Sequence, residues 1–143
     1  MIRREMQDEF LRLQKLLKKT IVFITHDFDE AARLADRIGI MKDGRIVQMA
    51  TPEAMISHPA DDYVREFTRD APRDRVVSIG AIASREIVLS NGVSVAASDK
   101  IGDAAAAVLS SDKPVTVVDA AGRAIGSVSR GQMITALFPD RRR

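Results

Sequence analysis

The chain has 143 residues, with 22 basic against 20 acidic side chains, a formal net charge of +2, one Tyr, no Trp and no Cys. The length suits one ordinary domain or two small ones. The charge is too small to argue for nucleic acid, and the aromatic content offers no platform for stacking bases. The lack of cysteine excludes disulfides and thiolate chemistry and fits a cytosolic protein.

The first part of the chain predicts a helix, a buried strand and a second helix. Apolar residues recur at three- and four-residue steps over 2–19, which indicates an amphipathic helix. Residues 20–25 (TIVFIT) are continuously apolar and β-branched, as in a strand that is buried on both faces of a parallel sheet. Asp27 with Glu30 three positions later resembles a capping box that opens a helix over 28–36.

A hairpin and two short helices are expected next. Asp43-Gly44 separates two apolar runs at 37–42 and 45–50, and glycine tolerates the positive φ of a type I′ turn. Thr51-Pro52-Glu53 combines a cap, a proline at the first position and an acid in the first turn, so it predicts a helix that stops before Pro59. Asp61 or Asp62 starts another helix, which runs to about residue 68.

A charged break at 69–74 (RDAPRD) predicts a boundary between two domains, at 1–69 and 70–143. The second part is rich in Ala, Val, Ser and Gly. Its expected elements are strands over 86–89 and 93–95 around the turn Asn91-Gly92, a helix over 101–109, strands over 114–118 and 124–128, and a helix over 131–137. The resulting order is β-α-β-β-α.

Residues 24–67 (ITHDFDEAARLADRIGIMKDGRIVQMATPEAMISHPADDYVREF) form one long, continuous motif. The motif closely resembles the end of the ATP-binding subunits of ABC importers for glycine betaine, proline and similar osmoprotectants. The fold class that this resemblance implies is α/β, with 1–69 as a truncated C-terminal part of a P-loop ABC ATPase domain.

The resemblance implies a catalytic role for His26. In that family the matching residue is the switch histidine, which follows a sheet strand at the edge where ligands of α/β folds bind. Its imidazole contacts the γ-phosphate and helps to hold the attacking water, because it can donate to developing phosphoryl charge. Asp27 is interpreted as a helix cap and not as a catalytic acid.

Several motifs of the complete ATPase do not occur in these 143 residues. There is no GxxxxGK[ST] loop and no LSGGQ-like signature, and neither VFITHD nor VTVVD is followed by the glutamate of a Walker B motif. We therefore expect ATP and Mg²⁺ to be cofactors of an intact subunit and expect no cofactor or ATP hydrolysis for this chain alone. The apolar strand 20–25 should also lack neighbours.

Residues of about 72–138 resemble a single CBS motif, the small unit often appended to these ATPases. The resemblance implies a regulatory role linked to sensing of ionic strength or nucleotides, and a single copy implies homodimerisation through a C2 interface. Adenosine-binding members carry Gly-x-x-Ser/Thr-x-x-Asp; here Gly126 and Ser129 fit, whereas Gln132 replaces the acid. Ser129 and Gln132 are thus the candidate ligand-binding residues, and an unrelated α/β unit is the alternative.

Three hypotheses follow for the whole chain. The first is the C-terminal portion of an osmoprotectant importer's ATP-binding subunit, whose partner is a membrane permease. The second is a non-enzymatic dimerising or sensing module, and the third is a non-functional truncated product. No apolar stretch approaches the ~20 residues that span a bilayer, and the N-terminus lacks a signal-peptide core, so we expect a cytoplasmic protein with no direct membrane span. Arg141, Arg142 and Arg143 are expected to be solvated. The alternative is a salt-screened contact with anionic lipid, made by these three residues together with Arg123 and Arg130.

Overall fold

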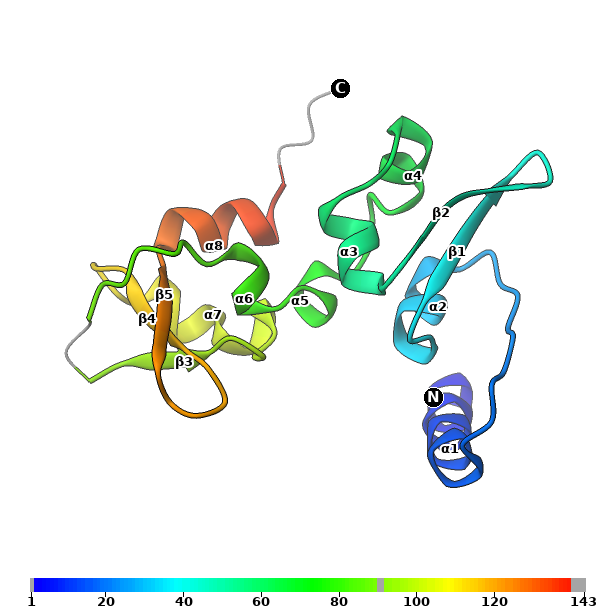
Figure 1. Ribbon diagram of the computed structural model, residues 1–143, viewed down its shortest axis with the longest axis horizontal. Coiled ribbons are helices and arrows are strands. Elements are labelled where there is room, and N and C mark those ends of the chain that lie inside the picture. The colour runs from blue at the N-terminus through cyan, green and yellow to red at the C-terminus, as the bar shows by residue number, and fades with distance from the viewer. Residues whose placement is uncertain (1, 90–91, 140–143) are drawn as a thin grey trace.

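A computed structural model describes residues 2–89 and 92–139. Figure 1 shows two groups of elements, with helix α5 (Arg73–Val76) between them. The first group contains α1 (Ile2–Leu17), α2 (Phe28–Leu34), β1 (Ile38–Lys42), β2 (Arg45–Ala50), α3 (Pro52–Ser57) and α4 (Asp62–Phe67). The second contains α6 (Ile79–Ile82), β3 (Ser94–Ala96), α7 (Ile101–Leu109), β4 (Val115–Val118), β5 (Ala124–Val128) and α8 (Arg130–Leu137). Asn91, half of a predicted turn, and the terminal arginines lie outside the described residues.

The predicted hairpin is confirmed. Strands β1 and β2 pair antiparallel, with Lys42 opposite Arg45 and Ile38 opposite Ala50. Asp43 and Gly44 have φ values of 50° and 75°, which are the positive values that a type I′ turn requires at both central positions. The hairpin therefore forms where its turn residues indicate.

The predicted helix starts that follow the hairpin are confirmed by their caps. The Thr51 side chain accepts a hydrogen bond from the Ala54 amide, and the Asp61 side chain accepts one from the Val64 amide. Both bonds satisfy amides that the first helical turn leaves without partners. The rings of Phe28 and Phe67 then meet edge to face, with centroids 6.3 Å apart, so α2 packs against α4.

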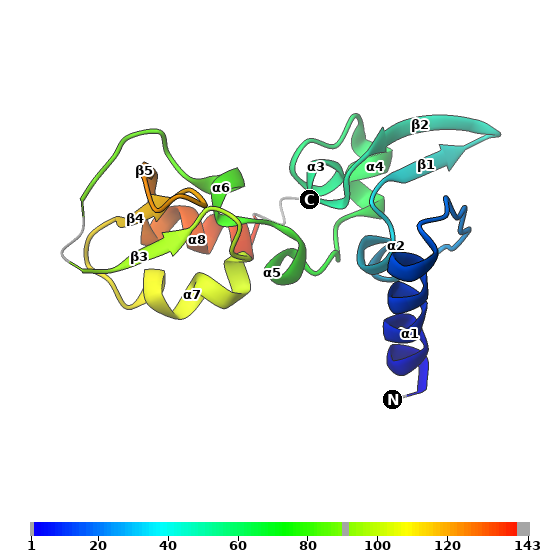
Figure 2. The ribbon, with the colours of Figure 1, turned by 60° about the horizontal axis from the view of Figure 1, so that its bottom comes forward.

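The predicted strand at 20–25 is wrong for this structure. These residues form no strand, and their apolar side chains lie in solvent; Val22 is 86% exposed and Ile24 is 92% exposed. A strand requires partners for its backbone N–H and C=O groups, and none of the described segments pairs with it. Residues 18–25 instead belong to the irregular connection from α1 to α2 (Figure 2).

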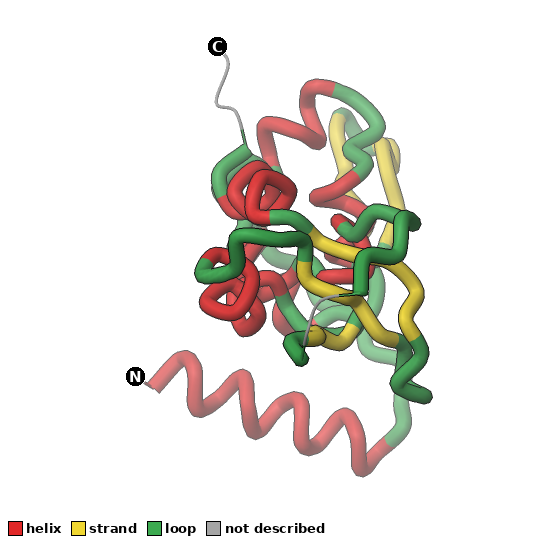
Figure 3. Tube along the Cα trace, turned by 90° about the vertical axis from the view of Figure 1, so that its left-hand side faces the viewer, coloured by secondary structure: helices red, strands yellow, loops and turns green. Residues whose placement is uncertain are grey.

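The β-α-β-β-α order of the second group is confirmed, although one of the predicted strands does not form. The sheet order is β3-β4-β5, with β3 parallel to β4 and β4 antiparallel to β5. The predicted strand at 86–89 does not form, whereas the strand predicted at 93–95 is present as β3, which begins at Ser94. Helices α7 and α8 pack against each other on one face of the sheet, as Figure 3 shows from the side.

Ser84 forms a backbone bridge with Ser127 of β5, and residues 86–88 then pass over the opposite face of the sheet, where side-chain hydrogen bonds hold them. Alternate residues of a strand face opposite sides, so Val115 and Val117 face the helices and Thr116 faces away from them. Thr116 Oγ1 donates to the Val88 carbonyl at 2.8 Å, and Ser127 Oγ donates to the Glu86 carbonyl at 2.7 Å. These bonds satisfy two buried hydroxyls and explain why the segment follows the sheet without becoming a strand.

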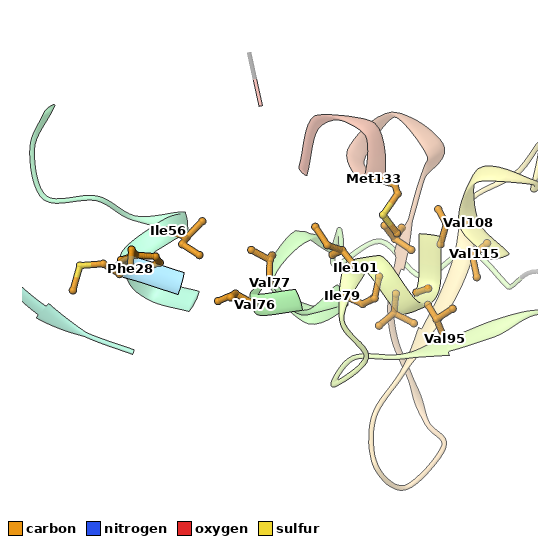
Figure 4. Close-up of a cluster of buried hydrophobic side chains, with 14 of the residues drawn as sticks. Phe28, Ile56, Val76, Val77, Ile79, Val95, Ile101, Val108, Val115 and Met133 are labelled. Atoms are coloured by element: carbon orange, nitrogen blue, oxygen red, sulfur yellow. The ribbon is translucent and has the colours of Figure 1, made fainter. Parts of the chain in front are cut away.

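The buried apolar side chains form one cluster that runs through both groups (Figure 4). Within the second group, Ile79, Ile101, Val115, Val128 and Met133 are fully buried. Helix α5 was not predicted, yet its Val76 contributes to the cluster. A four-residue helix is too short to produce a detectable hydrophobic periodicity.

The β4–β5 turn places Asp119 in a dense set of hydrogen bonds. Its carboxylate accepts from the Arg123 amide at 3.0 Å, from Arg123 Nε at 2.9 Å and from the Ala121 amide at 2.9 Å. The backbone bond from Arg123, followed by its side-chain bond, lowers the pKa of Asp119 below its ordinary value. The ionised form is therefore the one that the folded chain favours.

This turn gives a pH-dependent stability. Because the folded pKa lies below the unfolded one, the contribution of Asp119 is present above the unfolded pKa of about 3.9 and is lost as pH falls through the folded value. We expect Asp119→Asn to destabilise the chain at pH 7 and to flatten the fall of Tm between about pH 5 and pH 3. Asp112→Asn, at an exposed position, is the control; equal acid dependence in the wild type and Asp119→Asn would contradict this.

None of the helices in the described residues is long and apolar enough to cross a bilayer.

Candidate functional site

His26 lies in the loop that ends at the first turn of α2. The following residue, Asp27, caps this helix by accepting a hydrogen bond from the Glu30 amide at 3.2 Å. The Asp27 amide donates to Thr25 Oγ1 at 3.1 Å, and the Thr25 hydroxyl donates to Glu30 Oε2 at 2.8 Å. These bonds fix the backbone on both sides of His26, and they confirm the interpretation of Asp27 as a cap.

The side chain of His26 is exposed and borders an open depression. Its neighbours there are Asp27, Phe28, Asp29, Phe67, Asp70 and Ala71. Within the described part of the chain, these neighbours include no Lys or Arg that would attract a phosphate. The site thus presents an imidazole on a fixed loop but does not by itself form a phosphate cradle.

The helix α1 is held beside this loop by polar contacts. Gln7 Nε2 donates to Glu30 Oε1 at 3.3 Å, and Arg33 forms an ion pair with Asp8 at 2.6 Å. Glu30 therefore connects α1, the Thr25 hydroxyl and the first turn of α2. Sequence reasoning assigned Glu30 only to a capping box and took Thr25 as the end of a strand, so it missed this set of contacts around His26.

The two candidate ligand-binding residues of the second group lie together at the start of α8. Ser129 Oγ accepts from the Gln132 amide at 3.2 Å, while Gln132 Oε1 accepts from the Ser129 amide at 2.8 Å. This is a complete capping box. Gln132 Nε2 also donates to the Ile82 carbonyl at 3.1 Å, which ties α8 to α6. Binding of a nucleotide by these residues stays a prediction.

No group of three or more His, Cys, Asp or Glu side chains that could hold a metal ion occurs among the described residues.

The chain is homologous to part of the ATP-binding subunits of ABC importers for osmoprotectants. It is 47% identical, over 139 residues, to the trimethylamine N-oxide transport system ATP-binding protein TmoW of Pelagibacter ubique, and this match covers 96% of the chain and 41% of TmoW. Against the TmoW of Ruegeria pomeroyi the identity is 48% over 130 residues, or 91% of the chain and 38% of the relative. Against the glycine betaine/proline betaine transport system ATP-binding protein ProV of Escherichia coli it is 40% over 140 residues, or 96% of the chain and 34% of ProV.

The chain thus spans about two fifths or less of the length of these curated relatives. No family model matches it. The matches to TmoW and ProV extend well beyond the motif at 24–67 and include nearly the whole second group of elements.

Proposed function

We propose that this chain forms the C-terminal part of the ATP-binding subunit of an osmoprotectant importer, with His26 as its switch histidine. The observation that carries the proposal is the 47% identity to TmoW over 96% of the chain. In the complete subunit, ATP and Mg²⁺ are the cofactors, and a membrane permease is the partner on the cytoplasmic side.

The exposed segment at 20–25 supports this proposal on physical grounds. Its apolar, β-branched side chains are those of a strand buried on both faces, yet Val22 and Ile24 lie in solvent. A large exposed apolar patch of this kind marks an interaction site. The rest of an ATPase domain would supply the neighbouring strands and the covering helices, together with the phosphate-binding loop.

A chimeric subunit tests the proposal. The part of Pelagibacter TmoW that precedes the matched region is joined to residues 1–143, and ATP hydrolysis is followed by release of phosphate. We expect the chimera to hydrolyse ATP, with authentic TmoW as the positive control. The 143-residue chain should not hydrolyse ATP, because it contains no GxxxxGK[ST] loop. Turnover by the chain alone, or a folded but inactive chimera, would contradict the proposal.

The second candidate function is a non-enzymatic sensing module that dimerises through the CBS-like unit at about 72–138. It is favoured by the burial within the second group, where Ile101, Val115 and Met133 are fully enclosed. Ile134 of α8 and Phe138, the residue that follows the helix, remain exposed and offer a surface for a second copy. Sedimentation of the chain as a dimer that Ile134→Ser disrupts would favour this function, and a monomer would exclude the dimer.

A further inference from the structure

A pair of hydrogen bonds joins α3 to the start of α6, across the short helix α5. Oε1 of Glu53 accepts from the Ser78 amide at 2.6 Å and from the Ser78 hydroxyl at 2.7 Å. The two residues are 25 positions apart, and the contact is partly buried. Hydrogen bonds to an ionised acceptor are roughly twice as strong as neutral ones, so two of them on one carboxylate oxygen restrict both partners.

The Glu53 end of this contact is fixed in the first group of elements. Glu53 lies in the first turn of α3, which the Thr51 hydroxyl caps. The same helix buries Met55 and Ile56 in the apolar cluster. Because α3 is capped at its start and buried on one side, the helix is held in place, and Glu53 is held with it.

The Ser78 end is fixed in the second group. Ser78 forms a β-bridge with Lys100, the residue that precedes α7. The next amide, that of Ile79, donates to the Asp99 carbonyl at 2.8 Å. Ser78 therefore moves with the loop that connects β3 to α7.

The Ser78 side chain bonds to Glu53 and does not cap helix α6. It is the N-cap residue of α6, and serine is among the preferred residues there because its oxygen can accept from the helix amides. In this structure Ser78 makes no side-chain cap bond to α6, and its hydroxyl points instead to Glu53. The long-range contact replaces the local one that the sequence favours.

We propose that Glu53 and Ser78 form a coupling contact, which fixes the orientation of the CBS-like unit against α3 and transmits changes in that unit toward His26. Helix α5, which lies between the two groups in Figures 1 and 2, packs against both α3 and α7, and the Glu53–Ser78 contact adds a direct polar link past it. A ligand or partner that displaces the β3–α7 loop displaces Ser78, and through Glu53 it displaces α3. The regulatory meaning of this contact rests on the proposed function.

The route from α3 to His26 is short. Helix α3 packs on β2, and its Ile56 belongs to the same buried cluster as Phe28. Figure 4 shows Phe28 and Ile56 together at one end of this cluster. Phe28 opens α2, two residues after His26. A shift of α3 therefore reaches the helix whose cap holds the His26 loop.

Distance measurements between spin labels test the coupling contact in the full chain. The chain has no cysteine, so Arg45→Cys and Ala121→Cys, at exposed positions of the two groups, supply two unique labels. We expect one narrow distance distribution in the parent protein and its loss in Glu53→Ala, with an accompanying shift of the His26 ring resonances. Glu53→Gln, which keeps an acceptor but loses the charge, should broaden the distribution less.

Glu66→Ala is the matched control, because it removes an exposed carboxylate that pairs with Arg69. Like Glu53, both of these residues precede α5 in the chain. Far-ultraviolet circular dichroism verifies that each variant is folded, and Glu53→Gln serves if Glu53→Ala does not fold. An unchanged distribution in the Glu53 variants overturns the proposal, as does a change without any shift of the His26 resonances or an equal change in Glu66→Ala. None of these measurements uses ATP, so their outcome does not depend on whether the chimera hydrolyses ATP.

Discussion

Replacing His26 by alanine in the chimeric subunit is expected to lower the rate of ATP hydrolysis by about 10² to 10³, the usual loss when one donor to developing transition-state charge is removed. Among the side chains of Thr25, His26 and Asp27, we expect the imidazole to make this donation, since the Thr25 hydroxyl donates to Glu30 and the Asp27 carboxylate accepts from the Glu30 amide. The measurement is turnover at saturating ATP. Binding of ATP should change far less, because these 143 residues contain no GxxxxGK[ST] loop and His26 is expected to act on the transition state.

His58 provides the matched control for this substitution. It is the second of the two histidines in the chain, is also exposed, and ends α3, where its backbone carbonyl accepts from Gln48 Nε2 at 3.0 Å. His58→Ala keeps that carbonyl and should leave turnover unchanged. If the His26→Ala chimera and the His58→Ala chimera both hydrolyse ATP at the parent rate, His26 has no catalytic role.

Replacing Gly126 by alanine is expected to destabilise the second group of elements by about 3 kcal/mol or more, at the upper end of the usual cost of overpacking. A Cβ at this position in β5 would lie 2.2 Å from the carbonyl oxygen of Ser84, which is backbone and cannot rotate away. Ser84 is held there by two hydrogen bonds to Ser127, so relief of the clash must break this pairing. Urea unfolding measures the loss.

Gly131→Ala is the control for this glycine substitution. It lies in α8, and the nearest atom to an added Cβ is Ser129 Oγ at 3.9 Å, which is an ordinary contact. Alanine is favoured over glycine in a helix by about 1 kcal/mol, so this variant should be as stable as the parent or more so. Equal stability of the two alanine variants would show that the backbone of residues 83–85 moves freely, contrary to the structure.

The elements that sequence reasoning found have local causes. Asp43-Gly44 determines the hairpin through backbone conformation, and Thr51, Asp61 and Asp27 start helices by capping their own amides. Helix α7 matches the predicted bounds because its apolar side chains repeat with the helical period. None of these features depends on a distant part of the chain.

The elements that sequence reasoning missed have non-local causes. The run at 20–25 has the composition of a strand, but pairing requires neighbours that the described residues do not supply. The segment at 86–89 follows the sheet through the hydroxyls of Thr116 and Ser127, which lie about 30 and 40 positions further along the chain. In the same way, Glu53 reads as an ordinary first-turn acid, and only the fold brings it to Ser78.

The most direct test of the account is hydrogen exchange at the amides of residues 21–24. In the 143-residue chain these amides lie in an irregular, exposed segment and should exchange at nearly unprotected rates. In the chimera with TmoW, these amides are predicted to exchange slowly, as expected of a strand paired on both edges. Exchange that stays fast in a folded chimera would contradict the claim that this segment is a strand of a larger ATP-binding domain.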